Sequence, residues 1–143
     1  MIGEYSATFG ENGTASGKDS FAEGWCSTAA NFGSHAEGLS THATGFGAHA
    51  EGYNTVASGD NGAHAEGYYT TASASGSHAE GCRSVAQNQF SHAEGMFTSA
   101  LGDEAHAEGS ATIASGVGAH AEGIALGVDT KYTTTSEISS GKT

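Results

Sequence analysis

The residues with the clearest capacity for chemistry are a histidine and a glutamate two positions apart, in Gly33-Ser34-His35-Ala36-Glu37-Gly38. An imidazole next to a carboxylate could act as an acid–base couple or supply two ligands to a divalent metal ion. It could also have no chemical role. One copy of the motif does not separate these possibilities, and the rest of the chain has to decide between them.

The pair is repeated along most of the chain. Counted from Phe21, which takes the histidine position in the first clear copy, the motifs follow one another at steps of 14, 14, 15, 14, 14, 14 and 14 residues. The repeated histidines are His35, His49, His64, His78, His92, His106 and His120. The repeated glutamates are Glu23, Glu37, Glu51, Glu66, Glu80, Glu94, Glu108 and Glu122. A pair repeated in this way offers no unique nucleophile and no pocket, so we expect no enzyme activity and no cofactor.

The elements that position these pairs follow from two further columns of the repeat. A serine or threonine stands three residues after each motif glycine from Gly24 to Gly109, and an alanine stands five residues after it, as in Thr41 and Ala43. This alternation is typical of β-strands, and no stretch carries the 3.6-residue period of a helix. A fixed repeat of this length predicts stacked units. We therefore expect each repeat to form two short strands and one coil of a parallel β-solenoid, with coils about 4.8 Å apart.

Strand alternation also predicts which side chains are buried. The motif alanine and the later alanine should face each other across a thin interior, while histidine and glutamate point outward. Threonines such as Thr41 and Thr55 should face inward, which argues against an ice-binding threonine surface. Burying such small side chains stabilises a chain weakly, at about 25 cal/mol per Å² of apolar area. We therefore expect a second chain to cover the histidine and glutamate face.

Charge excludes several partners. The chain has a net charge of −12, from 16 acidic and 4 basic residues, and eight of the acids are the motif glutamates. Such a chain is a poor ligand for nucleic acid or an anionic membrane, and no apolar run predicts insertion into a bilayer. The two cysteines, Cys26 and Cys82, should lie four coils, roughly 19 Å, apart, too far for a disulfide within one chain.

The pattern predicts three regions. Residues 1–19 are expected to form an irregular or degenerate first coil, in which Phe9 and Ala15 still keep the register of the repeat. Residues 20–126 carry the His-Ala-Glu-Gly repeats of a β-roll. Residues 127–143 lose the pattern and are expected to form a degenerate coil, a cap or a linker.

With these columns in place, the chain resembles the YadA-like head repeat of trimeric autotransporter adhesins. That repeat is also about 14 residues long and reads Asn-Ser-Val-Ala-Ile-Gly followed by Ser/Ala and Ala. The stretch from Gly33 to Gly38, with Thr41 and Ala43, falls on the same frame, with His35 in the valine position and Glu37 in the isoleucine position. The His-Ala-Glu-Gly form is similar to repeats of phage and prophage tail fibre and tail spike proteins.

The resemblance implies a left-handed parallel β-roll of about eight 14-residue coils assembled as a homotrimer. Valine and isoleucine face the threefold axis in that family, so it implies a trimer interface made of the histidines and glutamates given above together with Phe21. It implies a structural or adhesive module of a phage tail fibre or tail spike, located in the virion tail, that extends or presents a region binding the host receptor. The alternative is the head of a bacterial trimeric surface adhesin, on the cell surface. The partners would be further copies of the chain and a host surface polysaccharide or protein.

The sequence also supports two other hypotheses about what the surface binds. Three symmetry-related imidazoles at one level, for example those of His35, His49 or any of the other repeated histidines, could hold a divalent ion and make the protein a metal-binding fibre. Seven nearly identical levels would then require seven ions, and no level stands out as a dedicated site. Away from the repeated histidines and glutamates, the variable column containing Tyr69, Arg83 and Phe97 is the first candidate for an exposed binding face.

Overall fold

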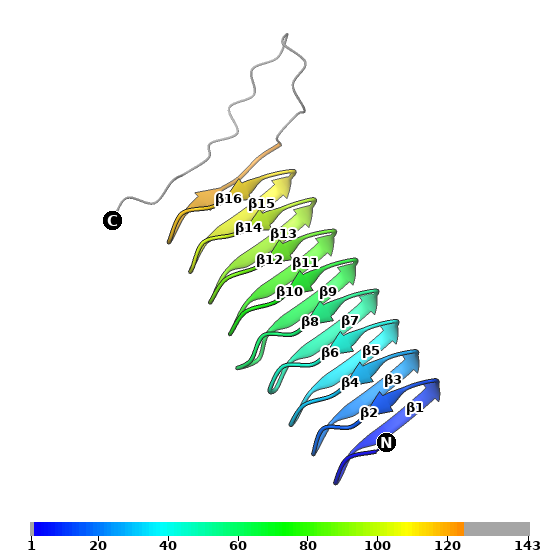
Figure 1. Ribbon diagram of the computed structural model, residues 1–143. Coiled ribbons are helices and arrows are strands. Elements are labelled where there is room, and N and C mark those ends of the chain that lie inside the picture. The colour runs from blue at the N-terminus through cyan, green and yellow to red at the C-terminus, as the bar shows by residue number, and fades with distance from the viewer. Residues whose placement is uncertain (1, 125–143) are drawn as a thin grey trace.

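The computed structural model describes residues 2–124, which form an all-β parallel β-solenoid of about eight turns with about 14 residues in each. Two strands alternate in every turn, a long one and a short one, and the turns stack along one axis with the long strands in one row and the short strands in the other (Figure 1). None of the described residues lies in a helix, so this part of the chain contains no helix that could cross a membrane. The predicted cap or linker at residues 127–143 lies outside the described residues.

The long strands form one parallel sheet, which has nine strands within residues 2–124. They are β1 (Ala7–Glu11), β3 (Phe21–Trp25), β5 (His35–Leu39), β7 (His49–Tyr53), β9 (His64–Tyr68), β11 (His78–Cys82), β13 (His92–Met96), β15 (His106–Ser110) and β17 (His120–Ala121).

The short strands form the second parallel sheet, with eight strands in the described part of the chain. They are β2 (Thr14–Ala15), β4 (Thr28–Ala29), β6 (His42–Ala43), β8 (Val56–Ala57), β10 (Thr71–Ala72), β12 (Val85–Ala86), β14 (Ser99–Ala100) and β16 (Ile113–Ala114).

The interior between the two sheets is built from small side chains. The motif alanines and the alanines of the short strands belong to one buried cluster, and almost all of them are 0% exposed. The serines and threonines that precede the short strands are also buried, as are the serine or alanine residues that precede the long strands, such as Ser34 and Ala48. The predicted division into inward alanine and hydroxyl columns and an outward histidine and glutamate face is confirmed. The column of Ser34 and Ala48 is an additional inward row; it stands two residues before the motif alanine, so strand alternation places it on the same side.

The turns before the long strands are held by the side chains of this additional row. Ser34 donates its hydroxyl hydrogen to the carbonyl oxygen of Asn31 at 2.7 Å and accepts the amide hydrogen of the same residue at 3.2 Å. Ser77 forms the same two bonds with Ala74. These side-chain bonds add to the backbone hydrogen bonds of the same turns, in which the amides of Ser34 and Ser77 donate to the same carbonyl oxygens.

The strand register is kept at the two places where the sequence departs from the regular repeat, which are the N-terminal segment and the 15-residue step. β1 pairs with β3 so that Ala7 lies opposite Phe21 and Phe9 opposite Glu23, which makes the N-terminal segment a coil of the same build as the others. The single 15-residue step is absorbed in the turn at Asn61 and Gly62, which both have positive φ, and His49 still pairs with His64. In-register pairing along the whole stack places like side chains above one another.

Candidate functional site: the histidine and glutamate ladder

The six long strands from β5 to β15 each place a histidine first and a glutamate third, on the outer face of the nine-stranded sheet. The register pairs His35 with His49 and Glu37 with Glu51, and the same pairing continues along the stack. Because neighbouring parallel strands lie about 4.8 Å apart, identical side chains form continuous rows. We call the two rows together the ladder; it contains the histidines and glutamates that the sequence placed at a trimer interface.

The imidazoles of the ladder stack face to face. Successive ring centroids from His35 to His120 lie 4.7–4.9 Å apart, and successive ring planes differ by only 2–8°. Phe21 ends the stack on the N-terminal side, with its ring edge-on to His35 at 5.2 Å. Phe9 packs against Phe21 at 5.7 Å, although it lies in the glutamate column.

Within one coil, the imidazole and the carboxylate approach each other without forming a good hydrogen bond. The Nε2 of each histidine from His35 to His106 lies 3.5–3.9 Å from an Oε2 of the glutamate two residues later. These six Nε2 atoms are enclosed, and none has a hydrogen-bond partner among the described residues. Enclosed polar atoms are nearly always hydrogen-bonded in folded proteins. The carboxylate of the same coil, just beyond hydrogen-bond distance, is therefore the nearest acceptor for each of these atoms.

Two imidazoles of the stack, those of His49 and His92, resist protonation. The pKa of His49 lies below its ordinary value of 6.5, mainly because burial penalises the charged form and secondly because His64 and His35 would carry the same charge. Glu51 and Glu37 act in the opposite direction, but more weakly. The same causes lower the pKa of His92. These two imidazoles are therefore neutral near pH 7.

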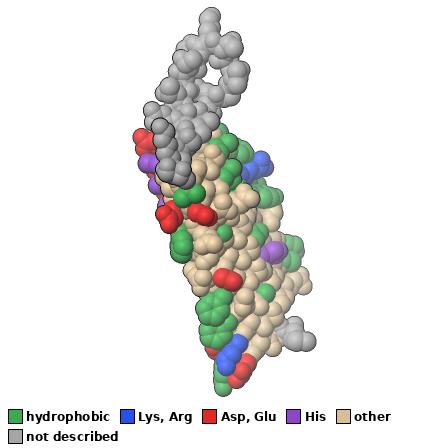
Figure 2. Space-filling model, turned by 60° about the vertical axis from the view of Figure 1, so that its left-hand side comes forward, with side chains coloured by type: hydrophobic (Ala, Val, Ile, Leu, Met, Phe, Trp, Pro, Cys, Tyr) green, Lys and Arg blue, Asp and Glu red, His purple; other side chains and the backbone are tan. Residues whose placement is uncertain are grey.

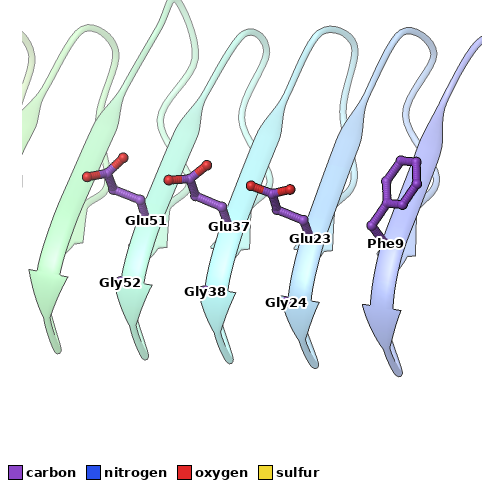
Figure 3. Close-up of a pocket in the computed structure, with 7 residues that line it drawn as sticks. All are labelled: Phe9, Glu23, Gly24, Glu37, Gly38, Glu51 and Gly52. Atoms are coloured by element: carbon purple, nitrogen blue, oxygen red, sulfur yellow. The ribbon is translucent and has the colours of Figure 1, made fainter.

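The glutamate row borders an open groove. The groove has a volume of about 540 Å³ and is lined by Phe9 and by glutamate–glycine pairs of three neighbouring strands: Glu23, Gly24, Glu37, Gly38, Glu51 and Gly52. Figure 3 shows the three carboxylates in one line, projecting to the same side of their strands, with the ring of Phe9 at the end of the line. A groove lined by carboxylates suits hydrogen-bond donors and disfavours anions.

The ladder brings metal-ligating atoms together, but their orientation does not suit one ion. In His35, Glu37 and His49, for example, one possible ligand atom of each residue lies within 4.8 Å of the other two. The lone pairs of an imidazole lie in the ring plane, and the planes of His35 and His49 are within 3° of parallel. Two such lone pairs do not converge on a common point, so consecutive histidines of one chain cannot chelate one ion in this arrangement.

The other predicted binding residues lie away from the ladder, at the corner between the long and the short strands. Tyr69, Arg83 and Phe97 occupy this corner in three successive coils, and all three are exposed. The guanidinium carbon of Arg83 lies 5.7 Å from the centre of the Tyr69 ring and 5.5 Å from that of Phe97. The structure therefore brings these three residues together. Cys26 and Cys82 occur as free thiols.

The corner has a feature that sequence reasoning missed. Tyr69, Arg83 and Phe97 have φ values of 57°, 56° and 59°, in the left-handed region that non-glycine residues seldom adopt. The other members of this column share it: Asn12, Cys26, Ser40, Asn54 and Ala111. Asparagine at two of these positions was the only local signal, and the mixture of residue types concealed it.

Sequence and structure searches add no relative to this description: no family model, curated protein or solved structure matches the chain. The parallel β-solenoid with 14-residue repeats therefore rests on the chain's own pattern and geometry.

Proposed function

We propose that the chain is a structural and adhesive module of a trimeric phage tail fibre or tail spike, in which three copies associate through the ladder and extend or present a region that binds the host receptor. The module would lie in the virion tail and would not act as an enzyme. The proposal draws on the resemblance of the repeat to YadA-like heads and on the rod-like stack of coils (Figure 1). Its strongest support is the continuous row of half-buried histidines and glutamates on the outer face of the long strands, which offers in-register polar groups to a neighbouring chain.

The energetics of a single chain favour association. Its interior is made of alanine, serine and threonine, so each coil buries little apolar area. The outer face of the long strands carries polar atoms that a neighbouring chain could pair with, because a neutral imidazole has one donor and one acceptor nitrogen. A polar interface of this kind fixes register only when each of its groups is satisfied.

Light scattering on the purified chain tests the association. We expect a mass of about three times 14.2 kDa, and a stable monomer would contradict the proposal. The variant His64→Glu adds a carboxylate to the middle of the ladder and should abolish the trimer, because like charges at an enclosed interface are costly.

A matched control is available on the other sheet. His42 lies in β6, is exposed and belongs to no histidine stack, so His42→Glu changes the charge equally and should leave the trimer mass unchanged. Loss of the trimer in both variants would assign the effect to net charge rather than to the ladder.

The phage origin is tested separately, by mass spectrometry of phage particles and of cell envelopes from the producing bacterium. Peptides found only in the envelope would favour the bacterial adhesin.

A further inference from the structure

The corner that carries Tyr69, Arg83 and Phe97 has the composition of a ligand site. The three residues occupy the same position in successive coils, where positive φ turns the chain from a long strand to a short one. The side chains of this corner are exposed, and parallel stacking keeps neighbouring positions about 4.8 Å apart. A regular backbone therefore presents three large side chains side by side.

The arginine is held between two aromatic rings. Its guanidinium carbon lies 5.7 Å from the ring centre of Tyr69 and 5.5 Å from that of Phe97, both within the range of a cation–π contact. Such contacts restrain a planar guanidinium while its N–H groups remain free to bind. Preorganised arginine forms two parallel hydrogen bonds to a carboxylate or phosphate.

The aromatic surface continues beyond the arginine. The ring of Tyr69 lies edge-on to Tyr53 at 5.4 Å and to Tyr68 at 4.7 Å, and Tyr53 and Tyr68 stack on each other at 5.2 Å. The three tyrosines are between 37% and 47% exposed. Flat aromatic faces bordered by a few polar groups are the usual platform for the C–H faces of a sugar ring.

The charge of Arg83 is not neutralised by any carboxylate of residues 2–124. Residues 2–124 contain two basic side chains, and the other one, Lys18, pairs with Glu4 at 3.3 Å. Arg83 forms no ion pair within the described residues, in a chain with a net charge of −12. In Figure 2 the basic side chains lie at two separate places, one beside acidic atoms and the other beside hydrophobic side chains.

We propose that this corner binds an acidic sugar, with the oxyanion of the sugar on the guanidinium of Arg83 and the sugar ring against Tyr69 and Phe97. The oxyanion is a carboxylate, as in a uronate, or a phosphate ester. The biological role of this site rests on the proposed function. In a tail fibre or tail spike, the site would make the module itself one of the parts that contact the host surface.

The test compares the affinities of four probes for the purified chain by calorimetry. Oligogalacturonate supplies a carboxylate on a sugar, phosphomannan supplies a phosphate on a sugar, maltohexaose is neutral, and polyglutamate is an anion without sugar. We expect binding of oligogalacturonate, phosphomannan or both, and at least tenfold weaker binding of maltohexaose and polyglutamate. Binding of one acidic sugar alone identifies which oxyanion the corner accepts.

Three variants locate the binding. Arg83→Gln should reduce the affinity for the acidic sugar at least tenfold, and Arg83→Lys should retain only part of it, because lysine cannot form the paired hydrogen bonds. Lys18→Gln removes the same charge from the ion pair with Glu4 and should leave the affinity within twofold. Equal binding by Arg83→Gln, equal binding of polyglutamate, or no binding of either acidic sugar would overturn the proposal.

Mass measurement on the same samples separates this proposal from the proposed function. A trimer that binds neither acidic sugar would overturn the sugar site alone. A monomer that binds acidic sugar through Arg83 would overturn the trimeric fibre and leave the site in place. A monomer without binding would overturn both.

Discussion

At the scale of single residues, the glycine that ends each His-Ala-Glu-Gly motif decides how closely the coils can stack. Gly67, in the middle of the stack, has a φ of +106°, a backbone conformation that L side chains rarely adopt. A β-carbon added at this position would run into the carbonyl oxygen of Gly81 in the next coil. The motif glycine is therefore required both by the backbone conformation and by the approach of the neighbouring strand.

Replacing this glycine should be severely destabilising. We expect Gly67→Ala to lower the free energy of unfolding by about 3–4 kcal/mol, since backbone strain and a clash with a backbone atom act together. The matched control is Gly33→Asn: Gly33 has a φ of +62°, and an added β-carbon would meet nothing within 4 Å. Asparagine tolerates that conformation, so the control should change stability by less than about 1 kcal/mol. Urea denaturation measures both, and equal losses would contradict the stacking argument.

Individual residues differ in how far the sequence predicts their role. The inward alanines and the outward histidines and glutamates follow from strand alternation, because side chains of a strand point to opposite faces in turn. The left-handed conformation of Arg83 and Phe97 does not follow from it. The stacked coils impose that conformation on whichever residue occupies the corner, so its side chain carries no signal.

At the scale of the strands, the repeat length predicts the pairing register well but does not predict how long each strand is. The 14-residue step places β5 on β7 and β6 on β8 correctly. The long strands extend through the motif glycine to five residues, whereas the short strands keep only two. The threonine expected to lie in a short strand, such as Thr41, instead precedes it, in the buried bend between the two sheets.

The buried threonines of these bends differ in whether their hydroxyl group has a hydrogen-bond partner. This difference predicts how their replacement by valine changes the free energy of unfolding. Thr41 donates to the hydroxyl oxygen of Ser27 at 3.1 Å, whereas Thr70 is buried with no partner for its hydroxyl among the described residues. Thr70→Val replaces an unsatisfied hydroxyl with a methyl group and should raise the free energy of unfolding by about 1 kcal/mol. Thr41→Val removes a formed bond and should lower it by about 1 kcal/mol.

Urea denaturation of the two valine variants provides the comparison. Both substitutions keep a β-branched side chain at an equivalent position, so volume and strand preference change in the same way. Opposite shifts of the midpoint, with unchanged denaturant dependence, would confirm that the hydroxyl partner decides the sign. A loss of stability in Thr70→Val as large as that in Thr41→Val would show that the Thr70 hydroxyl is satisfied.

At the scale of the whole molecule, the stack of imidazoles makes stability depend on pH. The sequence predicted the histidine row, but the face-to-face stacking within 2–8° of parallel comes from the in-register coils. Burial and then the neighbouring imidazoles lower the pKa of His49 and His92 below 6.5, while the neighbouring glutamates oppose this shift less strongly. Each histidine side chain of the stack is only about one third exposed, from 31% to 36% between His35 and His106.

The direction of this pH dependence follows from whether the folded or the unfolded chain binds protons at the higher pH. The unfolded chain takes up protons on its histidines near pH 6.5, whereas the folded chain takes them up on His49 and His92 only at lower pH. Stability is therefore fully present above pH 6.5 and is lost as the pH falls from 6.5 towards the lowered pKa values of the folded state.

Thermal melting between pH 8 and pH 5 measures this dependence. We expect the melting temperature to fall on acidification, and to fall less in the double variant His49→Gln and His92→Gln, which removes the two groups with lowered pKa values and keeps polar side chains of similar reach. The matched control His42→Gln lies outside the stack, on an exposed position of β6, and should retain the full dependence. A melting temperature that stays constant or rises between pH 8 and pH 5 would mean that the glutamate row compensates the protonated imidazoles. The ladder would then be a row of ion pairs and not a stack of neutral rings.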